Sequence, residues 1–147
     1  MKLTQHFSLE ELVFSETAVR YGVDNTPNKE QVAKLVWLAG CLEQIRILLG
    51  PLHVNSGYRC LELNRLLKSK DTSQHVKCEA VDLTSLTGKT PMQMCQLVRD
   101  SDLAFDQLIF EFKSWMHVSF AYNSTPRGSI LTIDGAGVRL GLHNGEQ

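Results

Sequence analysis

Residues 73–84, SQHVKCEAVDLT, set a histidine seven residues before an aspartate, and residues 115–120, WMHVSF, carry a second histidine. Apolar and polar residues alternate through the later half of the first stretch, which predicts a strand with Asp82 on the face opposite the core. The second stretch alternates in the same way and places His117 on its polar face. The two stretches could therefore bring His75, Asp82 and His117 together.

These three side chains form a donor set suited to a divalent metal ion. Two neutral imidazoles and one carboxylate fit a borderline-soft cation. Three protein ligands leave a fourth position for water, which is the arrangement of catalytic zinc sites. The sequence therefore predicts a zinc hydrolase.

Length and charge narrow the class of protein. The 147 residues fit one compact domain with a substantial core and are too few for two full-sized domains. With 15 basic and 16 acidic residues the net charge is -1, so we expect neither nucleic acid nor a membrane as a partner. No run is apolar and long enough to span a bilayer, and the first residues lack the apolar region of an export signal. We therefore expect a product made in the cytoplasm.

Hydrophobic spacing and capping residues divide the chain into helices and strands. They predict two short helices within residues 7–21 and further helices at 29–49, 61–67 and 91–100. Alternation predicts strands at 52–56, 79–84, 105–110, 115–120 and 130–133. Helices first and mostly strands afterwards indicate an α+β fold, a small antiparallel sheet flanked by helices. Residues 134–147 follow as a candidate mobile tail of this single domain, residues 1–147.

Three blocks occur in an order and spacing that resemble a known family: NSGYR at 55–59, SQHVKCEAVD at 73–82 and WMHVS at 115–119. From about Phe7 to Phe120 the chain resembles the zinc D-Ala-D-Ala carboxypeptidases and peptidoglycan endopeptidases, which include phage endolysins. That family shares its fold with the amino-terminal signalling domain of hedgehog proteins. The resemblance implies that His75, Asp82 and His117 are zinc ligands and that the substrate is a peptidoglycan stem peptide.

Peptide hydrolysis also needs a carboxylate that takes the proton of the attacking water and passes it to the leaving amine. Several relatives carry this acid three residues before the last histidine, where this chain has Ser114. If the two strands around this position form a hairpin, Glu111 lies almost opposite Met116 and His117, and we expect it to be the base. Asp106 is the reserve, although strand alternation places it on the opposite face.

Two further residues are candidates for substrate binding. The guanidinium of Arg59 could hold a substrate carboxylate or stabilise the oxyanion, or it could form only a surface ion pair. The hydroxyl of Ser73 could bind the terminal carboxylate of the substrate, or it could only cap local backbone.

Cys78 stands where the family usually has glycine, the one residue that takes a positive φ without strain. A cysteine there raises an alternative, a Cys–His nucleophilic pair with His75 or His117. The family spacing of Asp82 and the tendency of cysteine to act as a small buried hydrophobe favour the metal site instead. None of the four cysteines belongs to a Cys-x-x-Cys pair, so we expect reduced thiols.

We therefore expect a zinc metallopeptidase that cuts a D-amino-acid-containing bond of the stem peptide, as a D-Ala-D-Ala carboxypeptidase or an endolysin-type endopeptidase. Since its polymer substrate lies outside the membrane, such an enzyme fits a phage or prophage lysis product that acts on the cell wall. The alternative is a non-catalytic zinc-containing module of the same fold, either peptidoglycan-binding or part of a virion. The hedgehog domain, by resemblance, keeps its metal and performs no hydrolysis.

Overall fold

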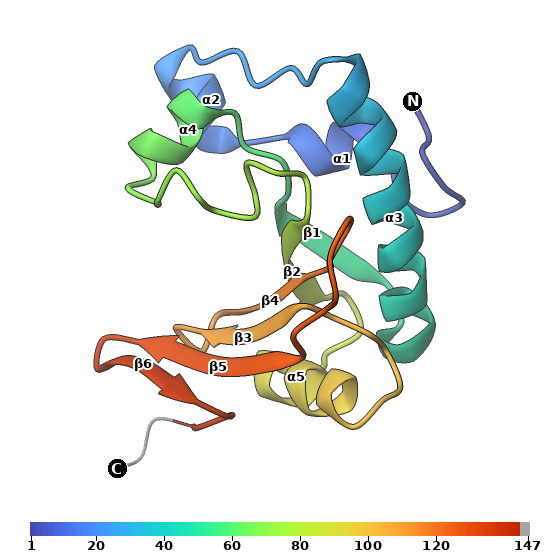
Figure 1. Ribbon diagram of the computed structural model, residues 1–147, viewed down its shortest axis with the longest axis vertical. Helices are drawn as coiled ribbons and strands as arrows, with labels where there is room; N and C mark the ends of the chain where they lie inside the picture. Colours follow the sequence, from blue (N-terminus) through green and yellow to red (C-terminus); the bar gives the residue numbers. More distant parts are fainter. Residues whose placement is uncertain (145–147) are drawn as a thin grey trace.

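The computed structural model describes residues 1–144, which form five helices and six strands (Figure 1). The helices are α1 (Leu9–Val13), α2 (Glu16–Tyr21), α3 (Lys29–Leu49), α4 (Leu61–Leu66) and α5 (Pro91–Arg99). The strands are β1 (Leu52–Ser56), β2 (Ala80–Ser85), β3 (Gln107–Glu111), β4 (Trp115–Ser119), β5 (Ser129–Asp134) and β6 (Gly137–Leu140). Every predicted helix and strand is confirmed within a few residues, and β6 is an addition.

Three of the helices begin with a capping box, in which the N-cap side chain and the third helical residue bond each other's backbone N–H. Ser8 and Glu11 form the box of α1. Thr90 caps α5 directly before Pro91, which needs no hydrogen bond at the first helical position. These local signals explain why the helices begin where the sequence predicted.

The six strands form one sheet in the order β1-β2-β4-β3-β5-β6. All neighbours are antiparallel except β3 and β5, which are parallel. The parallel pair arises because residues 120–128 carry the chain from β4 past β3 without a hairpin (Figure 1). The fold class is therefore α+β with a mostly antiparallel sheet, as predicted.

The segment predicted as a tail contains ordered secondary structure. Strand β6 pairs with β5 and forms one edge of the sheet. Its sequence is short and follows a turn signal, so alternation alone did not distinguish it from a loop. Residues 145–147 lie outside the described residues.

Helices α3 and α5 supply the core that supports the sheet. Their buried apolar side chains join those of β2, β3 and β4 in one cluster. Figure 1 shows α3 along one side of the sheet and α5 beneath it. Val81 and Leu83 point into this core, so alternation leaves Asp82 for the other face, as predicted. Within residues 1–144, no helix combines the length and the apolarity needed to cross a membrane.

A close backbone contact joins α1 to the end of β1. The Tyr58 N–H donates to the carbonyl oxygen of Leu12 at 2.7 Å. A Cβ atom at Gly57 would lie 2.4 Å from the same oxygen, closer than any side chain tolerates. Residue 57 must therefore be glycine, because the Leu12 carbonyl leaves no room for a side chain. The same contact between α1 and the end of β1 fixes the path of the chain toward Arg59.

We expect Gly57→Ala to lower the free energy of unfolding by about 1–3 kcal/mol, because the added methyl group must push α1 away from β1. Gly40→Ala is a matched control, since Gly40 is an exposed position within α3 with nothing within 4 Å of an added Cβ. That control should raise the free energy of unfolding by about 0.5–1 kcal/mol. Urea unfolding measures both, and an unchanged stability of Gly57→Ala would contradict the contact.

Candidate metal centre

The register of β2 and β4 sets Asp82 directly opposite His117. His75 lies in the loop before β2, and its ring centre is 5.2 Å from that of His117. All three side chains are buried, and one ligand atom of each lies within 4.8 Å of the others. The structure thus brings together the three residues selected from the sequence, and they could hold a metal ion.

The distances between the donor atoms fit a small divalent ion. Asp82 Oδ1 lies 3.3 Å from His75 Nε2 and 3.0 Å from His117 Nδ1. Two ligands of a tetrahedral zinc ion, each about 2.0–2.1 Å from it, lie roughly 3.3–3.4 Å apart. Two imidazole nitrogens and one carboxylate oxygen also match the donor types that zinc prefers. The residues present therefore fit this metal.

The ring of His75 is oriented by backbone. Its Nδ1 lies 2.8 Å from the carbonyl oxygen of Gly57. A carbonyl oxygen only accepts, so Nδ1 carries the proton and Nε2 keeps its lone pair toward Asp82. Burial lowers the pKa of His75, which favours the neutral ring that a metal ligand must have. Apart from the place of Gly57 in the NSGYR block, no sequence pattern indicates this role.

Asp82 is held in its ionised form. Burial opposes ionisation, but the adjacent His75 and His117 outweigh it and hold the pKa of Asp82 well below its usual range. Arg59 adds a positive charge, with its Nη2 3.5 Å from Asp82 Oδ2. The cluster therefore offers one carboxylate and two nitrogen lone pairs.

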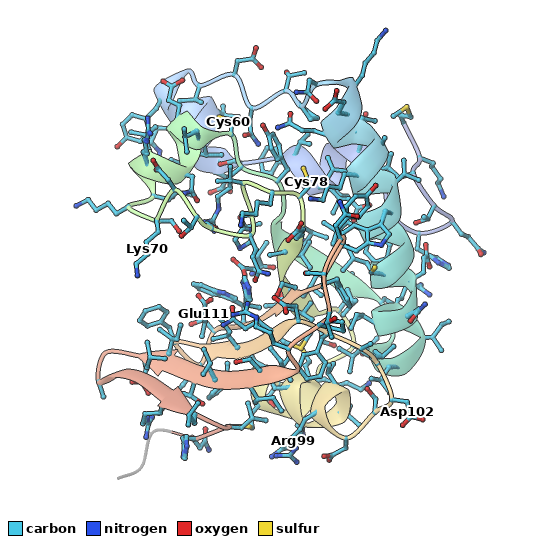
Figure 2. All side chains as sticks on the ribbon, viewed as in Figure 1. Cys60, Lys70, Cys78, Arg99, Asp102 and Glu111 are labelled. Atoms are coloured by element: carbon cyan, nitrogen blue, oxygen red, sulfur yellow. The ribbon has the colours of Figure 1, made fainter. Side chains whose placement is uncertain are left out.

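Glu111 lies at the end of β3, directly opposite Trp115. This pairing is one residue earlier than the sequence predicted, yet Glu111 Oε1 is 3.8 Å from Nδ1 of His117, its diagonal neighbour. Figure 2 shows Glu111 on the side of the sheet away from α5. Burial raises the pKa of Glu111, and the charge of Asp82 raises it further. A carboxylate with a raised pKa beside this cluster has the properties of a general base.

Arg59 is fixed in place beside the cluster. Its Nε donates to Ser56 Oγ at 3.0 Å and its Nη1 to Asn64 Oδ1 at 3.3 Å. The side chain is 14% exposed, so it is not the surface ion pair considered from the sequence. A guanidinium held this way can stabilise negative charge without first being ordered.

Ser73 and Cys78 shape the loop that carries His75. The Ser73 hydroxyl accepts the His75 N–H at 3.2 Å, and its own proton remains available to another acceptor. Cys78 is buried and has a φ of 61°, the left-handed conformation typical of glycine. Burial raises the pKa of the Cys78 thiol to about 11, so the structure does not favour it as a nucleophile.

Asp106, the reserve base, is bonded elsewhere. Its carboxylate accepts three hydrogen bonds from Arg127: from the backbone N–H and from Nε, both at 3.0 Å, and from Nη2 at 2.7 Å. It also accepts Nε2 of Gln74 at 2.8 Å. Gln74 directly precedes His75, so this hydrogen bond connects the loop that carries His75 to the start of β3. Sequence spacing did not reveal this network, because its members come from three separate segments.

A cleft of about 490 Å³ adjoins the cluster, within the usual range for ligand sites. It is lined by Arg59, Asp82 and Trp115 and by two segments, residues 14–17 and 53–56. Trp115 is thus a wall of the cleft. Its indole N–H is buried and has no hydrogen-bond partner among residues 1–144.

A protein-family model described as Peptidase M15 matches residues 5–119. The match contains every candidate metal ligand together with Arg59 and Glu111, and it ends before β5. No curated protein matches the chain significantly.

We expect Asp106→Asn to lower the free energy of unfolding near neutral pH by about 1–3 kcal/mol, because a buried carboxylate loses its bonds to Arg127. Hydrogen bonds from Arg127 lower the pKa of Asp106 to about 2, despite its burial. The ordinary value is near 3.9, so the stabilisation is complete above about pH 4 and is lost as the pH falls toward 2. Urea unfolding between pH 7 and 2.5 should show the wild type and the variant converging.

Asp102→Asn is the control for this series, because Asp102 is exposed on the preceding loop. Its stability should stay within about 0.5 kcal/mol of the wild type at every pH. A difference for Asp106→Asn that persists undiminished at pH 2.5 would show that its carboxylate charge contributes nothing.

Proposed function

The chain belongs to the M15 peptidase family, whose members are zinc peptidases acting on peptidoglycan, and we propose that it hydrolyses a D-amino-acid-containing bond of the stem peptide. The bond is the terminal D-Ala-D-Ala bond of a carboxypeptidase or the internal bond of an endolysin-type endopeptidase. The observation that carries the proposal is the convergence of His75, Asp82 and His117 beside Glu111 at the edge of a cleft.

In this proposal His75, Asp82 and His117 hold a zinc ion. The ion would polarise the substrate carbonyl and lower the pKa of a water molecule next to it. His75 contributes Nε2, because its Nδ1 is committed to Gly57, and His117 contributes Nδ1, which faces Asp82. The buried carboxylate of Asp82 supplies the negative charge of the ligand set.

Glu111 is the general base of the proposed reaction. It takes the proton of the attacking water and delivers it to the leaving amine. Its raised pKa suits both steps, because the group must first accept a proton and then release it. Asp106 is less suited, since its carboxylate is bonded to Arg127 and Gln74 and its pKa lies far below neutrality.

Arg59 and Ser73 bind the substrate. The fixed guanidinium of Arg59 stabilises the negative charge that develops on the carbonyl oxygen. The hydroxyl of Ser73, whose proton is not used by His75, donates to the substrate carboxylate. We further propose that residues 1–147 act as one domain at the cell wall, as a phage or prophage lysis enzyme.

The competing candidate is a zinc-containing module that binds peptidoglycan or belongs to a virion and performs no hydrolysis. A metal-binding module needs no carboxylate with a raised pKa beside its ligands. Glu111, 3.8 Å from His117 Nδ1, therefore favours the enzyme.

Incubation of the zinc-loaded protein with intact sacculi and with a stem peptide ending in D-Ala-D-Ala tests the function. We expect release of D-Ala or of new amino groups, its loss with a chelator and its recovery with added zinc. Mass analysis of the products identifies the bond that is cut. Full zinc occupancy without any release would support the non-catalytic module instead.

We expect Glu111→Gln to bind zinc normally but to lose activity by about 10²-fold or more, because glutamine cannot accept the proton. Zinc content and the initial rate of D-Ala release measure the two properties. Glu62→Gln, an exposed change in α4, is the matched control and should keep its full rate. A zinc-loaded Glu111→Gln protein with more than about a tenth of the wild-type rate would remove Glu111 as the base.

A further inference from the structure

Strand β1 has one unpaired edge. In the sheet order it has a single neighbour, β2. Among residues 1–144, the backbone groups of residues 53–56 form no hydrogen bond outside this pair. Alternate N–H and C=O groups along a strand point to opposite edges, so half of those in β1 are available to another chain.

The cleft follows this strand. Four consecutive residues of β1 line it: His53, Val54, Asn55 and Ser56. The side chain of Val54 packs against the core, on the face opposite Asp82. A cleft that also touches Val54 therefore reaches the edge of the strand, where the backbone is unpaired.

The strand ends at the candidate metal centre. Ser56 is the register partner of Asp82, and its hydroxyl accepts Nε of Arg59 at 3.0 Å. The pairing of β1 with β2 shifts between Val54 and Ser56, an irregularity of the kind common beside active sites. A chain laid along the unpaired edge of β1 therefore has Arg59 at one end, and there it must leave the edge and follow the cleft to approach Asp82, because β1 lies between that edge and β2.

We propose that the stem peptide binds as an added strand on the unpaired edge of β1, with its scissile carbonyl at the Arg59 end. This inference rests on the proposed peptidase function. Main-chain hydrogen bonds supply the affinity in strand addition. The mode suits a substrate whose D-alanine side chain is a single methyl group, because such a side chain offers little to recognise.

Amide hydrogen exchange of the zinc-loaded Glu111→Gln protein tests the binding mode, with a stem peptide ending in D-Ala-D-Ala as the probe. We expect alternate amides within residues 53–56 to exchange at least about tenfold more slowly when the peptide is bound, since each gains a hydrogen bond. The internal control is β6, the other edge strand of the same sheet, whose amides should not change.

A second measurement uses the wild-type enzyme and peptides methylated at one amide nitrogen at a time. Methylation at amides that face β1 should lower kcat/KM by at least about tenfold, and methylation at the amides between them should have a much smaller effect. Hydrolysis by the wild type without protection of residues 53–56 would overturn strand addition and leave the peptidase function intact. A peptide that the wild type does not cut would overturn the peptidase function and, with it, the proposed binding mode.

Discussion

The ionised carboxylate of Asp82 is buried, and the arrangement of the site follows from the need to compensate that charge. A buried carboxylate is strongly destabilising unless hydrogen-bond donors and positive charge surround it. Arg59, from the segment after β1, supplies one positive charge, and His117 from β4 and His75 from the loop before β2 set ring nitrogens beside the carboxylate, where a shared cation would compensate the rest. These residues come from different parts of the chain, so the cluster is complete only when the central sheet has formed.

Features that depend on neighbouring residues in the sequence could be predicted, whereas contacts between distant segments could not. Alternation identified the faces that carry Asp82 and His117, and capping residues located the helices, because both signals depend on neighbours in sequence. The parallel pairing of β3 with β5 depends on a crossing of the chain that no local pattern encodes. The hydrogen bond from Gln74 to Asp106, which joins the loop before β2 to the start of β3, is non-local in the same way, and no sequence pattern indicates it.

Cys78 shows how the loop before β2 tolerates a departure from its family. A non-glycine residue in the left-handed conformation costs about 1–2 kcal/mol. Contacts on both sides hold the loop in this shape: Nδ1 of His75 at the Gly57 carbonyl, and Glu79 Oε2 at 2.6 Å from Lys34 Nζ. Such strain persists only where the surroundings over-determine the backbone. The buried thiol packs within the core, which offsets part of the cost.

The position of Glu111 follows from the turn between β3 and β4. Phe112 and Lys113 both have positive φ, 50° and 56°, and the Ser114 N–H donates to the Glu111 carbonyl at 2.9 Å. Two consecutive positive φ values are typical of the tight hairpin turns that match the twist of a sheet. Neither residue is glycine or asparagine, so the turn is strained, and its shape must be imposed by the strand pairing on either side. Where several relatives carry an acid in the turn itself, this chain has Ser114, whose hydroxyl donates to the Phe112 carbonyl. The hairpin instead brings the carboxylate of Glu111, from the opposite strand, to His117. Glu111 is further from His117 along the sequence than residue 114 is, but its carboxylate still lies close to the imidazole.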